Sequence, residues 1–171
     1  MSTSESSAPP IGDSAKQALI DTWQREMATT LRVLRAYPEE QSELRPHERA
    51  KNARELAWMF TLELGLAMAA IRGALDFSGG IPAAPERLTD VIAAYEKSSV
   101  ELIDAIRGSD LSGTIQFLVA PKTLGDYTRP AFLWFLLHDQ IHHRGQFSVY
   151  LRMSGGKVPS IYGPTADEPW R

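Results

Sequence analysis

The stretch FLWFLLHDQIHHRGQFSVYL, residues 132–151, holds three of the chain's four histidines within six positions of an otherwise apolar run. In an α-helix, residues four apart lie on one face, about 6 Å apart along the axis. Two pairs therefore lie one above the other: Asp139 with His143, and His138 with His142. Either pair could bind a divalent metal ion, so the stretch predicts a long core helix that carries a candidate metal site.

The spacing of the large apolar residues favours the pair Asp139 and His143. The helix face that includes these two also carries Phe132, Leu136, Phe147 and Tyr150. We therefore expect both polar side chains to be buried. Because an unpaired buried carboxylate costs on the order of several kcal/mol, the pair indicates a functional role. The alternative, a hydrogen-bonded core histidine with no ligand, stays open.

The composition is that of one soluble domain. The chain has 171 residues, of which 43% are hydrophobic, and a net charge of −3 without a basic stripe, so we expect no nucleic-acid partner. With no cysteine, thiolate metal sites and cysteine nucleophiles are excluded. Residues 1–10 lack signal-peptide features, and no apolar run reaches the ~20 residues that span a bilayer. We expect a cytoplasmic protein with no membrane partner.

Four helical segments predict an all-α fold, a four-helix bundle with one long crossover connection. The first segment begins at a capping-box pattern in residues 14–17 and continues to Pro38. The second begins at a similar pattern in residues 52–55 and continues to Gly79 and Gly80.

The third segment has Pro85 in its first turn. The fourth runs from Thr128 to about Met153, and residues 111–127 before it indicate a long connection of extended character. These boundaries predict three regions. They are a disordered N-terminal segment (residues 1–11), the bundle (residues 12–154) and a Gly/Pro-rich C-terminal tail (residues 155–171).

Glu63 lies on the apolar stripe of the second segment, where a leucine would be expected. Bundles build sites from side chains on facing helices, so Glu63 could face Asp139 and His143 and complete a three-ligand site. The alternative is that Glu63 reaches the edge of the bundle or bonds a neighbouring arginine. Arg144 and Gln146 flank the predicted site and could hold an anionic substrate group, although a structural ion pair explains Arg144 equally well.

Two segments carry a family resemblance: HHRGQFSVYLR (residues 142–152) and ARELAW (residues 53–58). Together with the order of the helices they resemble the DinB/YfiT-like family of bacterial four-helix proteins, over roughly residues 14–155. The resemblance implies a homodimer with a divalent metal held by three histidines, one on the second helix and two at HxxxH spacing on the fourth. It also implies, for some members, transferase activity with a low-molecular-weight thiol such as bacillithiol, mycothiol or glutathione.

The chain departs from this implied ligand set. The last family histidine corresponds to His143, but the preceding one corresponds to Asp139 and the first to Met59. A thioether is a poor ligand for zinc or nickel, and Glu63, one turn after Met59, could replace it. His138 and His142 are also near enough to substitute.

Ligation by Glu63, Asp139 and His143 would neutralise a dication, and the metal would be a weaker Lewis acid than one held by three imidazoles. Mn, Fe, Ni or Zn are the candidate ions, and oxygen-rich ligation shifts the preference toward Mn²⁺, Fe²⁺ or Mg²⁺. Two functions remain open. One is a metal-dependent transferase or hydrolase acting on a small-molecule substrate. The other is a metal-free, degenerate bundle that serves as a ligand-binding or dimerisation module.

Apolar residues off the main stripes favour a homodimer, because a two-fold interface would remove them from water. These residues are Val33 on the first helix, Trp58 and Leu62 on the second, and Val100 on the third.

Overall fold

The computed structural model describes residues 8–76 and 78–170, and it confirms the four-helix bundle. The helices are α1 (Asp13–Arg35), α2 (Ala53–Arg72), α3 (Leu88–Gly108) and α4 (Arg129–Met153). A short 3₁₀ helix (Glu39–Gln41) precedes α2, and strands β1 (Thr114–Ala120) and β2 (Thr123–Thr128) form an antiparallel hairpin between α3 and α4. The hairpin is the extended part of the predicted connection.

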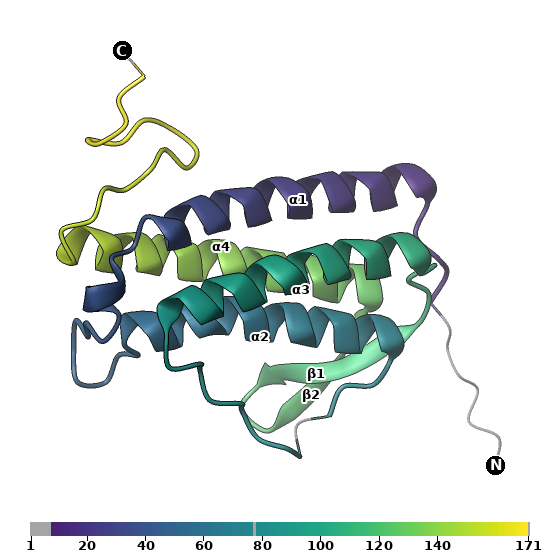
Figure 1. Cartoon of the computed structure of the whole chain (residues 1–171). Coiled ribbons are helices and arrows are strands. Elements are labelled where there is room, and N and C mark those ends of the chain that lie inside the picture. The colour runs from purple at the N-terminus through teal and green to yellow at the C-terminus, as the bar shows by residue number, and fades with distance from the viewer. Residues whose placement is uncertain (1–7, 77, 171) are drawn as a thin grey trace.

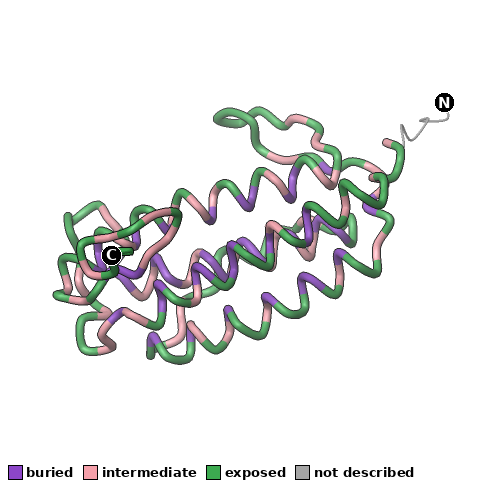
Figure 2. The backbone as a smooth tube through the Cα atoms, turned by 90° about the horizontal axis from the view of Figure 1, so that it is seen from above, coloured by how far each residue is buried: buried purple, intermediate pink, exposed green. Residues whose placement is uncertain are grey.

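The helices pack in a ring in which α1 and α2 each contact both α3 and α4 (Figure 1). Buried positions recur along the facing sides of the helices, and exposed positions lie on the outer sides (Figure 2). The α4 helix lies between α1 and α2, so that side chains on two adjacent faces of α4 enter the interior. This position of α4 determines where its histidines lie.

The long crossover is the segment of residues 73–87 (Figure 1). Helices α2 and α3 begin at the same end of the bundle, where the Arg54 guanidinium donates a hydrogen bond of 2.8 Å to the Pro85 carbonyl. The crossover must therefore return along α2, which is about 30 Å long, and its residues can span up to about 50 Å. The predicted long connection at residues 111–127 instead joins neighbouring helix ends through the hairpin.

The predicted capping box at the start of α2 is confirmed. The Glu55 backbone N–H donates to the Asn52 side chain and the Asn52 N–H donates to the Glu55 carboxylate, both at 2.8 Å. The helix ends at Arg72, earlier than the expected Gly79 and Gly80, because Gly73 takes a left-handed conformation with φ 68°.

The predicted start of α4 is also confirmed, with Thr128 as its N-cap, whereas the predicted starts of α1 and α3 are wrong. Helix α1 begins at Asp13, and its N-cap residue Gly12 makes no side-chain capping bond, so residues 14–17 lie inside the helix. Helix α3 begins at Leu88, three residues after Pro85. The Glu39 carboxylate, distant in sequence, accepts hydrogen bonds of 2.8 and 2.9 Å from the N–H groups of Leu88 and Thr89. A tertiary contact therefore caps α3.

The terminal segments contact the bundle where the structure describes them. Residues 1–7 of the predicted disordered segment lie outside the described residues, whereas the Ala8 carbonyl accepts a hydrogen bond of 3.1 Å from the Gly113 N–H. Residues 155–170 form no helix or strand, as their composition predicts. They nevertheless return to the bundle, where Asp167 forms an ion pair of 2.5 Å with Arg152 of α4.

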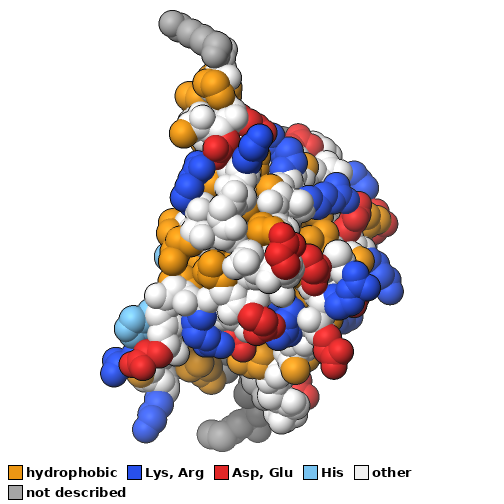
Figure 3. Space-filling view, turned by 60° about the vertical axis from the view of Figure 1, so that its left-hand side comes forward, with side chains coloured by type: hydrophobic (Ala, Val, Ile, Leu, Met, Phe, Trp, Pro, Cys, Tyr) orange, Lys and Arg blue, Asp and Glu red, His pale blue; other side chains and the backbone are white. Residues whose placement is uncertain are grey.

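The surface seen in Figure 3 carries acidic and basic side chains interspersed, so that face has no continuous basic patch. Among the helices of the described residues, none combines the length and the apolar character needed to cross a bilayer.

Replacement of Glu39 by alanine should destabilise the fold by about 1 kcal/mol, the usual cost of losing a helix cap. The physical reason is that two N–H groups of α3 lose their acceptor. Urea unfolding of Glu39→Ala measures the loss, and Glu40→Ala, at the exposed neighbouring position, is the control. Equal stability of the two variants would contradict the tertiary cap.

Candidate metal centre

Glu63, Asp139 and His143 come together in the structure. Glu63 lies in the middle of α2, and Asp139 and His143 lie one turn apart on α4. One ligand atom from each residue lies within 4.8 Å of the other two. The packing of α2 against α4 therefore brings together the three residues that the helical spacing predicted.

Glu63 is buried, with a side chain only 3% exposed, and its two carboxylate oxygens differ in their contacts. Oε1 lies 2.6 Å from Nδ1 of His143, which is a short hydrogen bond. Oε2 is buried and has no hydrogen-bond partner among the described residues. A buried carboxylate oxygen without a partner destabilises the fold, so contact of a ligand with this atom would be favourable.

The protonation of the pair reflects its burial. Loss of solvent raises the pKa of Glu63 to about 7, although the hydrogen bond from His143 acts in the opposite direction. The hydrogen bond with Glu63 in turn raises the pKa of His143, against the effect of burial. Near neutral pH a small change in conditions therefore changes the number of protons on the pair.

The three residues are compatible with a divalent ion. Metal–ligand bonds of about 2.1 Å place neighbouring ligand atoms roughly 3 to 3.5 Å apart, and the ligand atoms here lie within 4.8 Å. The donor set offers one imidazole nitrogen and two carboxylates, which suit a range of first-row divalent ions. The unpartnered Glu63 Oε2 would gain the contact that it lacks.

Asp139 and His143 are less buried than the sequence predicted. Asp139 and His143 are half-buried, because they lie at the seam between α4 and α2 and not at the centre of the bundle. The fully buried polar residues at this level are Gln140 and Arg144, one position further around the helix. The pattern of apolar residues could not distinguish these faces, because α4 is covered on two sides. The half-exposed position leaves the candidate metal centre open to solvent on one side.

Arg144 does not join the cluster. It is 1% exposed and turns toward α1, where its guanidinium forms an ion pair of 2.6 Å with Glu26 and donates to the hydroxyl of Thr30 at 3.2 Å. The same guanidinium lies 2.5 Å from the hydroxyl of Tyr162, in the C-terminal segment. These bonds correct the substrate-binding role expected for Arg144, because the structural ion pair occupies its donors.

The remaining predicted residues lie around the cluster. Gln146 is exposed, and its amide lies 2.9 Å from Nε2 of His142, which is also exposed. His138 is exposed beside the ring of Trp134. Met59 is half-buried and lines a groove with residues of the 81–84 segment. Among the described residues, neither His138 nor His142 belongs to the group of possible metal ligands.

Among the buried polar residues that sequence reasoning missed, two link the helices. Glu26 is the partner of Arg144, and its spacing from Thr30 and Val33 on α1 could have placed it on an inward face. Gln140 accepts a hydrogen bond of 2.9 Å from Tyr95 of α3 and donates one of the same length to the Phe60 carbonyl of α2. No short-range pattern identifies Gln140, because both of its partners lie on other helices.

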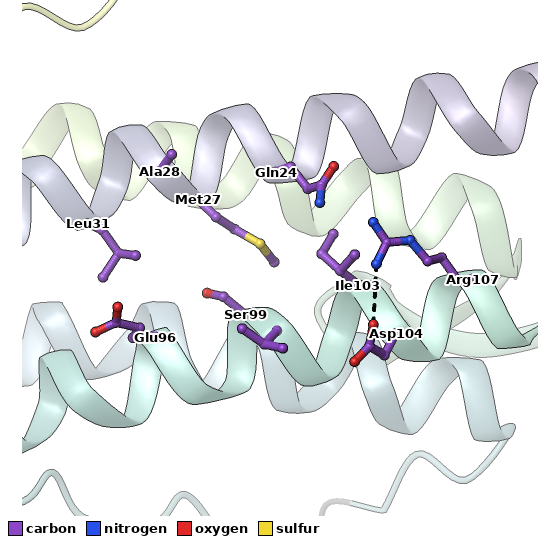
Figure 4. Close-up of a pocket in the computed structure, with 10 residues that line it drawn as sticks. Gln24, Met27, Ala28, Leu31, Glu96, Ser99, Ile103, Asp104 and Arg107 are labelled. Carbon is purple, nitrogen blue, oxygen red and sulfur yellow. Dashed lines mark hydrogen bonds and ion pairs between the residues drawn. The ribbon is translucent and has the colours of Figure 1, made fainter.

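Two grooves border the bundle on opposite sides of this interior. One, of 480 Å³, lies beside the cluster and includes His143 in its wall. The other, of 340 Å³, lies between α1 and α3, with Met27 on one side and the ion pair of Asp104 and Arg107 at one end (Figure 4). No cluster residue lines the second groove, so only the first bears on the chemistry of the site.

The chain is a four-helix bundle with a carboxylate–histidine cluster between two facing helices, and bundle proteins build their sites from side chains placed in this way. The chain belongs to the DinB family, whose family model matches residues 1–170. It is 25% identical to the Bacillus subtilis (strain 168) protein called "Uncharacterized protein YrdA" over 154 residues, covering 87% of this chain and 89% of that protein.

Two crystal structures share the fold. A DinB-like protein from Bacillus cereus ATCC 10987 aligns with a TM-score of 0.72 at 19% identity, covering 85% of this chain and 97% of the other. The DinB-like protein YjoA from Bacillus subtilis aligns with a TM-score of 0.68 at 19% identity, covering 84% and 97%. The family resemblance of the sequence is therefore confirmed.

The stability of the metal-free protein should depend on pH through Glu63. Its folded pKa of about 7 lies above the ordinary 4.5, so between these values the native state binds more protons than the unfolded state. Its contribution to stability is complete below about pH 4.5 and is lost as the pH rises through about 7. The pKa of His143 is also raised in the folded state. Stability should therefore fall further as the pH rises above the ordinary pKa of a histidine.

Urea unfolding of wild type and Glu63→Gln at about pH 5 and about pH 8 tests this, because glutamine does not titrate. Wild type should lose stability relative to the variant as the pH rises. A stability difference that is the same at both pH values would contradict the raised pKa of Glu63.

Proposed function

We propose that the protein is a metal-dependent enzyme, a thiol-dependent transferase or a hydrolase, whose divalent ion is held by Glu63, Asp139 and His143. The observation that carries the proposal is the buried, unpartnered Oε2 of Glu63, in a carboxylate that has an oxygen within 4.8 Å of ligand atoms of two residues on the facing helix. Burial of a carboxylate oxygen in an apolar bundle costs free energy unless a ligand contacts that oxygen. Family membership supports the proposal, since the resemblance implies a metal at this level of the bundle.

The bound ion would supply Lewis acidity, lowering the pKa of a thiol or water at an open position, though less than an ion held by three imidazoles. The chain's own residues orient the ligands. The ring of Phe60 meets the His143 ring edge to face, with centroids 6.4 Å apart and an interplanar angle of 89°. Asp139 lies one turn away on the same helix, so the rigid backbone of α4 fixes the separation of two ligands.

The second function is a metal-free bundle that binds a small ligand or another copy of the chain. The observation that favours it is the 2.6 Å contact between His143 and Glu63, which satisfies one oxygen of the carboxylate without any ion. Thermal unfolding with added Mn²⁺, Ni²⁺ and Zn²⁺ separates the two functions. A specific ion at 100 times its dissociation constant stabilises the fold by about 2.7 kcal/mol, and the metal-free function requires no shift with any ion.

We also propose that the protein is a cytoplasmic homodimer. Val100 of α3 is 62% exposed at the groove between α1 and α3, and Trp58 and Leu62 of α2 are partly exposed. Val33, in contrast, is 1% exposed and belongs to the core, so it does not contribute to an interface. The exposed apolar residues on α2 and α3 are those that a second copy would cover.

Protein purified without a histidine tag should contain about one divalent ion per chain. Glu63→Gln, Asp139→Asn and His143→Ala should each lower the metal content strongly, since loss of even a supporting contact to a ligand costs 10–100-fold in affinity. Metal analysis measures this, and the exposed His138→Ala and His142→Ala are matched controls that should retain the ion. Metal contents well below one per chain in every protein would reject the enzyme proposal.

Light scattering after size exclusion should give about 38 kDa, twice the chain mass of 19.0 kDa. Val100→Arg should shift the mass toward that of a monomer, because a charge at a buried interface position has no partner. Met153→Arg, at an exposed residue of α4, is the control and should leave the dimer intact. A wild-type mass near 19.0 kDa at micromolar concentration would show the dimer prediction to be wrong.

A further inference from the structure

The groove beside the candidate metal centre is lined by both apolar and polar side chains. Its volume is 480 Å³, within the range of small-molecule sites. Its apolar lining includes Leu56, Val149 and Tyr150, and its polar lining includes Lys51, His143 and Gln146. Because His143 belongs both to the groove and to the metal cluster, a molecule in the groove lies next to the candidate metal centre.

Lys51 is the available positive charge of this groove. It is exposed and forms no ion pair with any described residue, whereas the nearby Arg45 and Arg54 are engaged by the carboxylates of Glu55 and Glu43. The charge of Lys51 acts to lower the pKa of His143, which places the ammonium within electrostatic reach of the imidazole.

The backbone at Lys51 is held in place. The Tyr150 hydroxyl donates a hydrogen bond of 3.0 Å to the Lys51 carbonyl and so joins the loop before α2 to α4. The next residue, Asn52, is the buried N-cap of α2 and bonds to both Glu55 and Glu43. The cation therefore projects from a fixed backbone in a groove that also has an apolar wall, which is an arrangement that favours ligands with both an apolar and an anionic part.

We propose that the groove between residues 46–56 and α4 binds a small organic anion, with its apolar body against Leu56, Val149 and Tyr150 and its anionic group at Lys51. The inference that this anion is the substrate of the enzyme rests on the proposed function. Binding of the anion itself does not require the metal. Neutral apolar molecules would leave Lys51 unused, and small inorganic anions would leave the apolar wall exposed to water. The amphipathic anion is the class that satisfies both.

Fluorescence titration with anilinonaphthalene sulfonate, an aromatic sulfonate, tests the proposal on the full-length protein, both metal-free and with Mn²⁺. Lys51→Met should weaken binding about three- to fivefold, the effect of losing a partly exposed ion pair, and Lys51→Arg should retain it. Val149→Glu, which places a negative charge at an exposed position of the wall, should weaken binding further. Lys97→Met on α3 is the charge-matched control and should behave as wild type.

Equal affinity of wild type and Lys51→Met would overturn the proposal, as would equal weakening by Lys97→Met. The two hypotheses fail separately. Binding of the sulfonate that depends on Lys51 in a protein that takes up no metal supports the anion groove and rejects the metal-dependent enzyme. Metal uptake that depends on Glu63, together with sulfonate binding that is unchanged by Lys51→Met, supports the metal-dependent enzyme and rejects the anion groove.

Discussion

The buried ion pair between Arg144 of α4 and Glu26 of α1 constrains the rest of the bundle. Both side chains are almost fully removed from water, at 2% and 6% exposure. Removal of one partner from such a pair typically costs about 3–5 kcal/mol, because the other charge stays buried. Helix α4 can therefore neither rotate nor slide against α1 without breaking the pair, and the hydroxyl of Tyr162 ties the C-terminal segment to the same two charges.

The rotation that places Arg144 toward α1 places His143 toward α2, since consecutive residues lie about 100° apart on a helix. Gln140, one turn before Arg144, bonds to both α3 and α2 and fixes the same register. The contact of His143 with Glu63 is thus a consequence of the packing of α4. The candidate metal centre lies on a rigid frame, and its half-buried residue His143 lines a groove.

Much of the fold could be predicted from local patterns. The apolar spacing identified all four helices, and the Asn52 capping box and the Thr128 cap marked two starts that the structure confirms. The start of α3 could not be predicted because its cap, Glu39, comes from another segment. The three cluster residues could be predicted because Asp139 and His143 share a helix face and Glu63 interrupts an apolar stripe. A structural ion pair was one of the two interpretations of Arg144, but its partner Glu26 could not be predicted because it lies more than a hundred positions away in the sequence.

In our proposal, Glu63, Asp139 and His143 hold one ion between α2 and α4. Its most direct test is a crystal structure of the protein grown with Mn²⁺, with anomalous scattering recorded to locate the metal. We expect a single strong peak bonded to Glu63 Oε2, an Asp139 oxygen and a His143 nitrogen, at about 2.0–2.3 Å. A peak on the exposed His138 and His142, or a cluster in which the hydrogen bond between His143 and Glu63 persists without an ion, would contradict it.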